Sequence, residues 1–262
     1  MLSKAKNMNS KVLTIDVGNT KSKLALSDGG ILTSGVRLAD HETTVDEALR
    51  LARSSGAAGC LVSSVAEGAG EMVAKMRDGG LPTALLTVDM RLPFVIDYVA
   101  PRTLGSDRIA GAVGVLAAWG RKDALVIDAG TAITYDFLSA DGHFRGGAIS
   151  PGIAMRFRAL HAFTAKLPLC GADDYVGNAV GRDTRQAIAA GVMCGIWAEA
   201  EYFIGKLREM TPDAIVVVTG GDYKNFDLTA KKGIFAGHNL VLQGLAYLAK
   251  YNIDAIVSAS KL

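Results

Sequence analysis

Hydrophobic and polar positions along this chain follow two alternating patterns. Short runs rich in valine, isoleucine and leucine, each bounded by turn residues, predict strands at residues 12–16, 23–27, 59–63, 84–88, 124–128, 133–137 and 214–219. Stretches with helical periodicity lie between and after these runs, at residues 44–55, 71–79, 106–119, 182–210 and 239–250. Strands that alternate with helices predict an α/β fold whose central strands are largely parallel.

One element of this pattern occurs twice. The segment "VLTIDVGNTKSKLAL" (12–26) is an apolar strand that ends in Asp16, turns through a glycine and resumes as a second strand. The segment "LVIDAGTAITYDFL" (125–138) repeats this arrangement around Asp128. An internal repeat of this kind predicts two similar domains. The polar break "WGRKD" favours a boundary near Gly120, which gives lobes of residues 11–119 and 120–262 around a shared cleft.

The helix at residues 44–55 carries a start signal. Thr43 or Thr44 precedes the apolar repeat, and Glu47 follows Thr44 by three residues. A hydroxyl residue followed three positions later by glutamate is the pattern of a capping box. We therefore expect a threonine to cap this helix.

Composition and charge exclude several classes of protein. The net charge of +2 is too small to indicate a nucleic-acid-binding surface, so we expect no nucleic-acid partner. The three cysteines, Cys60, Cys170 and Cys194, are widely spaced, which favours buried reduced thiols over a disulfide framework or a zinc site.

Neither the N-terminal segment nor the longest apolar run of the sequence is predicted to enter a membrane. The opening "MLSKAKNMNS" is polar and lacks the apolar core of a signal peptide. The uncharged apolar run at residues 187–198 is too short to span a bilayer. We expect a cytoplasmic protein with no membrane partner and with an N-terminal extension before Lys11.

The two hairpins suggest phosphate chemistry. A glycine such as Gly18 lets backbone approach phosphate oxygens closely, because it has no Cβ. A carboxylate beside phosphate is repulsive unless a cation intervenes, so Asp16 and Asp128 imply a metal ion. One such hairpin could equally be an ordinary turn with a surface aspartate. Two of them favour a site for a nucleoside polyphosphate and a cation, and the other common nucleotide-binding motifs are absent from the sequence.

Nucleotide binding by paired hairpins resembles the acetate/sugar kinase, Hsp70 and actin superfamily, which implies two ribonuclease-H-like (actin-like ATPase) domains. Within it the chain resembles type III pantothenate kinases from Lys11 onward. The motifs that carry the resemblance are "DVGNT" (16–20), "YVAPRTLGSDR" (98–108), "DAGTAITYD" (128–136), "GGAISPG" (146–152), "TAKLP" (164–168), "GRDTRQAIAAG" (181–191), "TGGD" (219–222) and "NLVLQGL" (239–245). The N-terminal extension departs from the family pattern.

The resemblance implies ATP-dependent phosphorylation of pantothenate, the first step of coenzyme A biosynthesis, by a homodimer that uses ATP with Mg²⁺. It implies that Asp107 accepts the proton and that a monovalent cation, K⁺ or NH₄⁺, binds at Asp128. The implied ATP ligands are Asp16, Val17, Gly18, Asn19, Thr20, Lys21, Ser22, Lys23 and Thr131. The implied pantothenate ligands are Tyr98, Gly105, Ser106, Asp107, Arg108 and Thr184.

Several of these residues also have an ordinary structural interpretation. Asp107 falls in the first turn of a predicted helix, where the helix dipole favours a depressed pKa, and it could be a plain N-terminal charge. Arg108 suits a carboxylate or phosphate of a ligand, or a salt bridge to a neighbouring acid. Tyr98 could be a packed aromatic residue, and Thr184 a helix cap. The apolar face at 187–198 predicts a partner surface, which favours the homodimer.

Two other functions stay open on the sequence alone. A kinase of this superfamily could phosphorylate a sugar or another small polyol, although the motif at residues 98–108 argues against it. Relatives of the family have been described as transcriptional accessory proteins, so a regulatory binding role is the third hypothesis. The near-neutral charge and the lack of a helix-turn-helix pattern argue against direct DNA binding.

Overall fold

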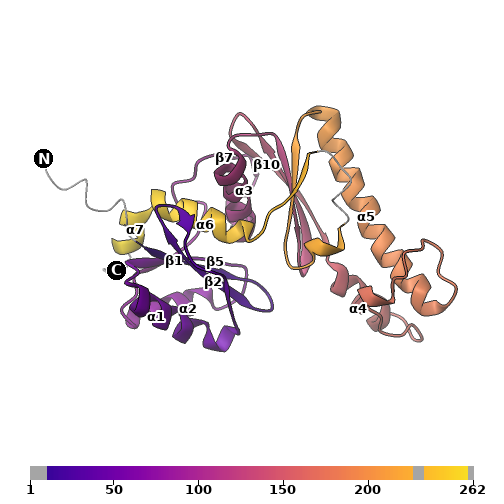
Figure 1. Cartoon of the computed structure of the whole chain (residues 1–262), viewed down its shortest axis with the longest axis horizontal. Coiled ribbons are helices and arrows are strands. Elements are labelled where there is room, and N and C mark those ends of the chain that lie inside the picture. The colour runs from indigo at the N-terminus through magenta and orange to yellow at the C-terminus, as the bar shows by residue number, and fades with distance from the viewer. Residues whose placement is uncertain (1–10, 227–232, 259–262) are drawn as a thin grey trace, which may run out of the picture. The chain divides into compact units, whose positions relative to one another are not determined.

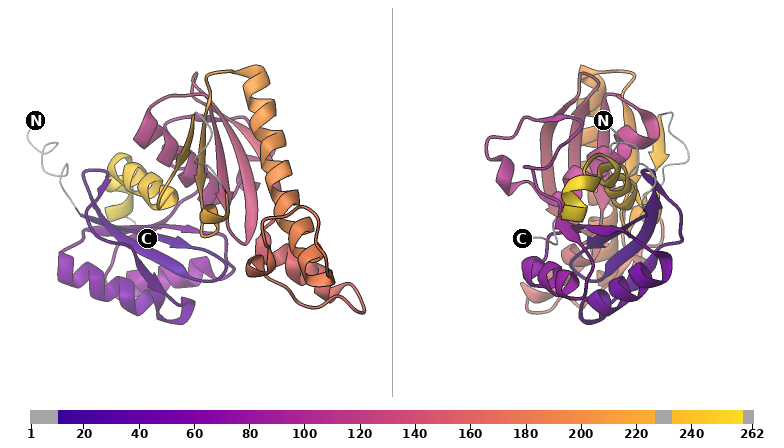
Figure 2. Two further views of the ribbon diagram at one scale, coloured as in Figure 1. Left: turned by 45° about the vertical axis from the view of Figure 1, so that its right-hand side comes forward. Right: turned by 90° about the vertical axis from the view of Figure 1, so that its left-hand side faces the viewer.

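The computed structural model describes residues 11–226 and 233–258 (Figures 1 and 2). These residues form two compact units. The first contains the chain up to Arg121, Gly142–Phe144 and the chain from Asn239 onward, and the second contains Lys122–Asp141 and Arg145–His238. The predicted extension before Lys11 lies outside the described residues. Each unit combines a mixed sheet with helices, which confirms the predicted α/β class.

The sheet of the first unit has the strand order β3-β2-β1-β5-β6, and β4 also pairs with β2. β1 runs antiparallel to β2 and parallel to β5, and Asp16 lies opposite Lys23 on one side and Ser63 on the other. The strands are β1 Val12–Val17, β2 Ser22–Asp28, β3 Ile31–Leu32, β4 Arg37–Ala39, β5 Gly59–Ser64 and β6 Thr83–Leu85. β6 ends earlier than the predicted strand at residues 84–88, because the chain turns where Met90 N–H donates to Thr87 O.

Helices cover both faces of this sheet, with α1 and α2 below it and α6 and α7 above it in Figure 1. Leu13 and Ile15 of β1 point to the α1/α2 side and pack with Leu51 and Met76. The elements are η1 His41–Thr43, α1 Thr44–Ser55, α2 Ala69–Asp78, η2 Pro101–Thr103, α3 Ser106–Trp119, α6 Leu240–Tyr251 and α7 Ile253–Ser258.

The C-terminal helix α6 packs in the first unit, against α3. A Cβ on Gly244 would lie 1.8 Å from Ala110 O, and a Cβ on Gly114 would lie 2.4 Å from Leu240 O. Two glycines thus let the helix backbones meet. The packing of α6 therefore differs from the predicted lobe of residues 120–262, and that division into functional lobes stays a prediction.

The second unit repeats the strand arrangement of the first. Its order is β12-β11-β8-β9-β10, with β8 antiparallel to β9 and parallel to β11. Asp128 of β8 lies opposite Thr134 and Thr219, so it occupies the place in its strand that Asp16 occupies in β1. The strands are β8 Ala124–Ala129, β9 Ala132–Ser139, β10 His143–Pro151, β11 Ile215–Thr219 and β12 Ile234–Ala236. This correspondence confirms the prediction of two similar domains.

The β10 strand links the two units covalently. Its first residues, His143 and Phe144, belong to the first unit, where they pair in parallel with β7 (Val95–Ile96). The helices of the second unit are α4 Ile153–Ala162, η3 Ala172–Asp174, α5 Thr184–Met210 and η4 Tyr223–Asn225.

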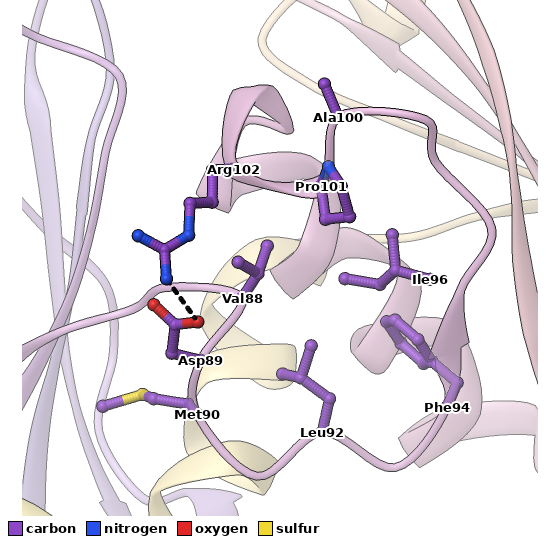
Figure 3. A pocket seen from close by; sticks show the side chains of 9 residues that line it. All are labelled: Val88, Asp89, Met90, Leu92, Phe94, Ile96, Ala100, Pro101 and Arg102. Atoms are coloured by element: carbon purple, nitrogen blue, oxygen red, sulfur yellow. Dashed lines mark hydrogen bonds and ion pairs between the residues drawn. The ribbon is translucent and has the colours of Figure 1, made fainter.

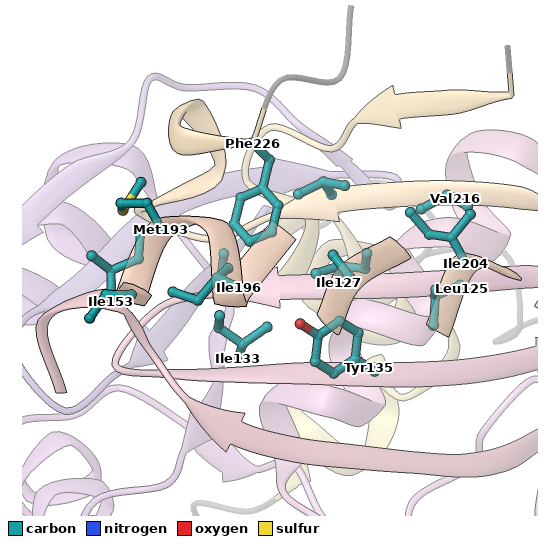
Figure 4. Close-up of a cluster of buried hydrophobic side chains, with 14 of the residues drawn as sticks. Leu125, Ile127, Ile133, Tyr135, Ile153, Met193, Ile196, Ile204, Val216 and Phe226 are labelled. Carbon is teal, nitrogen blue, oxygen red and sulfur yellow. The ribbon is translucent and has the colours of Figure 1, made fainter. Parts of the chain in front are cut away.

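Helix α5 forms the core of the second unit together with the sheet (Figure 4). Val192 and Ile196 are buried in one cluster with Ile127 and Tyr135. The expectation that the apolar face at 187–198 needs a partner was therefore wrong, since its large residues pack inside the unit. By length and composition the whole of α5 is able to cross a membrane, unlike the shorter run considered from the sequence. Its nine buried residues explain its apolar character as that of a core helix.

The predicted capping box of α1 was wrong. Thr43 has helical backbone angles, φ −99° and ψ −5°, because η1 leads directly into α1, and its side chain makes no cap. The Thr43 hydroxyl donates instead to Asp40 O at 3.1 Å. Glu47 forms ion pairs with Arg37 and Arg50.

Candidate active site

The first predicted phosphate hairpin joins β1 to β2. Gly18 N–H donates to Lys21 O at 3.2 Å, so this amide closes the turn. Among the described residues, neither the Asn19 nor the Thr20 amide donates to a backbone carbonyl of a turn or loop, and both residues are exposed. Two exposed N–H groups at the tip of a turn are suitable donors to phosphate oxygens.

The side chains of this hairpin divide into buried and exposed groups. Val17 and Ser22 are buried, and the Ser22 hydroxyl oxygen lies 2.8 Å from that of Thr44. Lys21 is exposed, with its Nζ 3.6 Å from Asp40 Oδ1. Of the polar residues predicted at this turn, Ser22 thus faces the interior, whereas Asn19, Thr20 and Lys21 face outward.

Gly18 is not required by the backbone of the hairpin. Its φ is not in the left-handed region, and an added Cβ would meet only Lys21 O, at 3.4 Å. The fold therefore tolerates a side chain here. A requirement for glycine would come from a ligand that approaches the backbone closely.

The other predicted acidic group of the first unit lies at the start of α3. The Ser106 hydroxyl lies 3.0 Å from Ser63 Oγ, accepts from Ser64 N–H at 3.0 Å, and lies 3.2 Å from Ser64 O. Ser63 also lies opposite Asp16 in the sheet. The end of β5 therefore fixes the position of Asp107, the next residue, relative to the hairpin of Asp16.

The Asp107 carboxylate folds back over the first turn of α3. Its Oδ1 accepts from Arg108 N–H at 2.8 Å, and a Cβ on Gly105 would lie only 2.5 Å from that oxygen. Gly105 thus leaves the space that the carboxylate occupies. Burial raises the pKa of Asp107, and this effect outweighs the backbone hydrogen bond and the charge of Arg108, which lower it. The depressed pKa expected from the helix dipole was therefore wrong in direction, because desolvation dominates.

The Arg108 guanidinium is buried and packs against two neighbouring aromatic rings. Its Cζ lies 5.8 Å from the Tyr98 ring centroid and 5.7 Å from the Phe144 ring centroid, and Nη1 lies 3.4 Å from Tyr98 Oη. Only 6% of Arg108 is exposed. Tyr98 is therefore both a packed aromatic residue, as its structural interpretation held, and a partner that orients Arg108.

The second hairpin lies in the second unit, between β8 and β9. Gly130 N–H donates to Ala132 O at 3.0 Å, and Gly152 N–H donates to Thr131 O at 3.0 Å. A Cβ on Gly152 would lie 2.1 Å from Gly130 O, so only glycine fits against this turn. The loop of residues 130–132 is thus held from outside by the residue that precedes α4.

The "TGGD" motif packs against the end of β8 in the same unit. Gly220 has φ +95°, and Asp222 N–H donates to Ala129 O at 2.9 Å. Burial raises the pKa of Asp222. The motif therefore places a turn and a half-buried carboxyl group beside the strand that carries Asp128.

Thr184 is exposed at the first residue of α5 and is not its cap. Asp183 caps the helix, since its Oδ1 accepts from Gln186 N–H at 2.9 Å. The preceding loop is fixed by Arg185, which contacts Asp174 through two nitrogens at 2.9 and 3.0 Å. Thr184 is thus presented on an ordered helix start.

The donor chemistry at Asp128 suits a hard cation. Among the described residues, no group of three or more histidine, cysteine or acidic side chains could hold a metal ion. A cation at this position would therefore combine a carboxylate with backbone carbonyl or ligand oxygens, which alkali and alkaline-earth ions accept.

A separate hollow of about 650 Å³ lies within the loop that precedes the Asp107 helix (Figure 3). It is lined mainly by apolar side chains, and Arg102 contacts Asp89 at its rim at 3.4 Å. The lining residues are Val88, Asp89, Met90, Leu92, Phe94, Ile96, Ala100, Pro101 and Arg102. None of the predicted substrate residues is among them.

The predicted site residues thus fall into two groups. Asp16–Lys23, Tyr98 and Gly105–Arg108 belong to the first unit, and Asp128, Thr131 and Thr184 belong to the second. Sequence reasoning missed three residues that contact the first group, namely Ser63, Phe144 and His41. Ser63 ends a predicted strand, which was the only local signal; nothing near Phe144 or His41 marks a site.

Sequence comparisons show that the chain is similar to type III pantothenate kinases. A model of the type III pantothenate kinase family matches residues 12–206. A type III pantothenate kinase of Bacteroides fragilis is 39% identical over 240 residues, which cover 92% of this chain and 98% of the relative. Another, of Flavobacterium johnsoniae, is 34% identical over 246 residues, covering 93% of this chain and 99% of the relative.

Solved structures share the fold at lower identity. A structure from Campylobacter jejuni described as a "conserved putative Baf family transcriptional activator" has a TM-score of 0.63 at 21% identity and covers 92% of this chain and 99% of its own. The activator of the 2-hydroxyisocaproyl-CoA dehydratase from Clostridium difficile, with bound ADPNP, has a TM-score of 0.52 at 14% identity and covers 96% and 97%. These likenesses concern the fold alone.

Proposed function

Because this chain belongs to the type III pantothenate kinase family, its function is ATP-dependent phosphorylation of pantothenate, and we propose that Asp107 accepts the proton of the attacking hydroxyl. The reaction forms a bond between the primary hydroxyl oxygen and the γ-phosphorus. The bond from that phosphorus to the bridging oxygen breaks, ADP leaves, and the hydroxyl proton passes to the carboxylate. This is the first step of coenzyme A biosynthesis.

The observation that carries the role of Asp107 is its half-buried carboxylate with a raised pKa at the start of α3. A base is more effective when its pKa approaches the working pH, and burial moves an aspartate in that direction. In phosphoryl transfer the proton leaves late, so the position of the base matters as well. The contacts of Ser106 with β5 supply that position.

The hairpins of Asp16 and Asp128 would hold the phosphates of ATP. The amides of Asn19 and Thr20 are available as donors, and exposed Lys21 adds positive charge. Magnesium bound with ATP would offset the repulsion between phosphates and carboxylates. Thr131 lies on the corresponding turn of the second unit. The ligand roles of Asp16–Lys23 and Thr131 follow the family pattern.

Pantothenate would be oriented by Arg108. A buried guanidinium held against Tyr98 and Phe144 would be pre-organised for a carboxylate, since its planar fork loses little freedom on binding. Gly105, Ser106 and Thr184 complete the proposed acceptor site. Ser106 is already engaged by β5, so its contribution would be mainly positional.

A monovalent cation, K⁺ or NH₄⁺, would bind at Asp128. The strand-end carboxylate and the nearby turn offer oxygen donors, which suit such an ion. Its charge would reduce the repulsion between Asp128 and the polyphosphate.

A homodimer and a cytoplasmic location complete the proposal. Exposed Thr184 on an ordered helix start suits a residue that acts across a subunit interface. A mass near that of one chain, 27.4 kDa, in size-exclusion chromatography at micromolar concentration would contradict the dimer.

The experiment that tests this function is ADP release with pantothenate as acceptor, in magnesium and potassium. We expect turnover in potassium that collapses when sodium replaces it. Equal turnover in both ions would contradict the cation role of Asp128 but not the kinase. A panel of sugars and polyols serves as the acceptor control, and ADP release with these but not with pantothenate would contradict the acceptor.

A further inference from the structure

A short segment outside all the predicted site residues contacts the first phosphate hairpin at three places. The segment is residues 40–44, which contains η1 and leads into α1. His41 Nε2 lies 2.9 Å from Gly18 O, Asp40 Oδ1 lies 3.6 Å from Lys21 Nζ, and the hydroxyl oxygens of Thr44 and Ser22 are 2.8 Å apart.

The contact of His41 with Gly18 fixes the direction of a hydrogen bond. A carbonyl oxygen can only accept, so His41 Nε2 carries the hydrogen and donates it. The Gly18 C=O and the Asn19 N–H belong to one trans peptide and point in opposite directions. A donor on this oxygen therefore fixes the peptide plane of Gly18 and Asn19, and with it the direction of one of the two exposed N–H groups.

The contact of Thr44 with Ser22 anchors the segment itself. Both side chains are fully buried, and Thr44 Oγ1 also lies 2.9 Å from Asp40 O. The preceding strand β4 pairs with β2, with Ala39 opposite Ser22. The backbone at the start of η1 is therefore tied to the sheet, and His41 is held where its ring reaches the turn.

Apolar packing holds the base of the hairpin, where Val17 belongs to the buried cluster, whereas residues 19–21 at its tip are exposed. A hollow of about 360 Å³ lies beside the hairpin, and its lining includes Val17, Ser22 and His41. Hydrogen bonds from residues 40–44 therefore support the part of the hairpin that side-chain packing leaves exposed. The ion pair of Asp40 with Lys21 contributes little, because both side chains are more than half exposed.

We propose that His41 and Thr44 are positioning residues for the ATP phosphates, which hold the hairpin so that the amides of Asn19 and Thr20 point at the nucleotide. This rests on the proposed function insofar as that hairpin binds ATP. It assigns no contact between either residue and the substrate pantothenate.

The test measures binding of magnesium with a non-hydrolysable ATP analogue by calorimetry, and binding of pantothenate separately. His41→Phe removes the donor at an exposed position, so folding should persist. Loss of one hydrogen bond predicts nucleotide binding about three- to tenfold weaker, with unchanged pantothenate binding. His41→Gln, whose amide can donate to Gly18 O, should bind nucleotide within about twofold of the wild type. Thr44→Val should weaken nucleotide binding in the same direction.

A matched control comes from the second unit. His161 Nδ1 lies 2.8 Å from Leu167 O, also at an exposed histidine, so His161→Phe removes a similar contact away from the hairpin and should leave nucleotide binding unchanged. Unchanged nucleotide affinity in His41→Phe, or equal loss in His41→Gln, would overturn the positioning role. A wild-type chain that binds the nucleotide without phosphorylating pantothenate would overturn the proposed function alone.

Discussion

The hydroxyl oxygens of Ser63 and Ser106 lie 3.0 Å apart, and this contact joins the end of β5 to the start of α3. Ser63 is opposite Asp16 in the sheet, and Ser106 immediately precedes Asp107. The two carboxylates proposed for phosphate and proton chemistry in the first unit are thus connected through a pair of serines. The distance between them is set by a strand end and a helix start, which are both rigid elements.

Removal of the Ser106 hydroxyl should therefore affect both stability and turnover. Ser106→Ala leaves Ser63 Oγ and Ser64 N–H without their partner, which should lower the free energy of unfolding by about 1–3 kcal/mol. Ser63→Ala should have a smaller effect, because Ser106 keeps its contacts with Ser64. Denaturant unfolding of both single variants and of the double variant measures the interaction free energy between Ser63 and Ser106. A lower kcat in Ser106→Ala with little change in KM would support a positional role for Ser106. If all three variants were as stable as the wild type, the proposed link between β5 and α3 through these serines would be contradicted.

The raised pKa of Asp107 makes the ionised carboxylate a source of instability. Between the ordinary aspartate pKa of about 3.9 and the raised folded pKa, the native state binds more protons than the unfolded state, so stability falls as pH rises. The penalty is complete above the folded pKa and absent below the unfolded one. Asp107→Asn should therefore be at least as stable as the wild type near pH 8, and this advantage should disappear below about pH 4.

The same substitution should abolish turnover, with a loss of at least about a hundredfold in kcat. Wild-type kcat/KM should also fall on the acid side as Asp107 becomes protonated. Thermal unfolding at several pH values and steady-state kinetics give both measurements. An Asp107→Asn variant that keeps most of its kcat would show that another group accepts the proton.

Substitution of Arg108 tests whether pantothenate binding needs the planar guanidinium group or only a positive charge. Arg108→Lys keeps the positive charge but loses the planar group that packs against Tyr98 and Phe144, so KM for pantothenate should rise about tenfold or more. The matched control is Arg102→Lys, because the Arg102 side chain is 83% exposed and pairs only at the surface with Asp89. Substrate kinetics should separate the two variants, and equal KM values would mean that the aromatic setting of Arg108 is only structural.

Substitution of Gly18 tests whether glycine at this position is required for folding or for ATP binding. Gly18→Ala adds a Cβ that meets only Lys21 O at 3.4 Å, so stability should change by no more than about 0.5 kcal/mol. If phosphates approach this backbone, KM for ATP should nevertheless rise several-fold. Gly35→Ala is the control, since a Cβ there would have no neighbour within 4 Å. Unchanged KM for ATP in Gly18→Ala would argue against close approach of phosphate at this turn.

The sequence determined the local elements of the site. The two strand-turn-strand segments around Asp16 and Asp128 are visible as apolar alternation interrupted by an acid and a glycine, and the structure has both as hairpins. The start of α3 at Ser106 and the presence of two similar domains were also predictable, because periodicity, turn residues and an internal repeat can be recognised locally. The capping of α1 and α5 was not, because a cap depends on the backbone that precedes the helix.

Only the tertiary structure decided how these elements are held together. Ser63 meets Ser106, Phe144 meets Arg108, and His41 meets Gly18 through contacts between residues far apart in the chain, which leave no local pattern. The direction of the Asp107 pKa shift belongs to the same class, because the helix dipole is a local property whereas burial depends on everything packed around the carboxylate. Local propensity thus fixes which residues can form the site, and long-range packing fixes their chemistry.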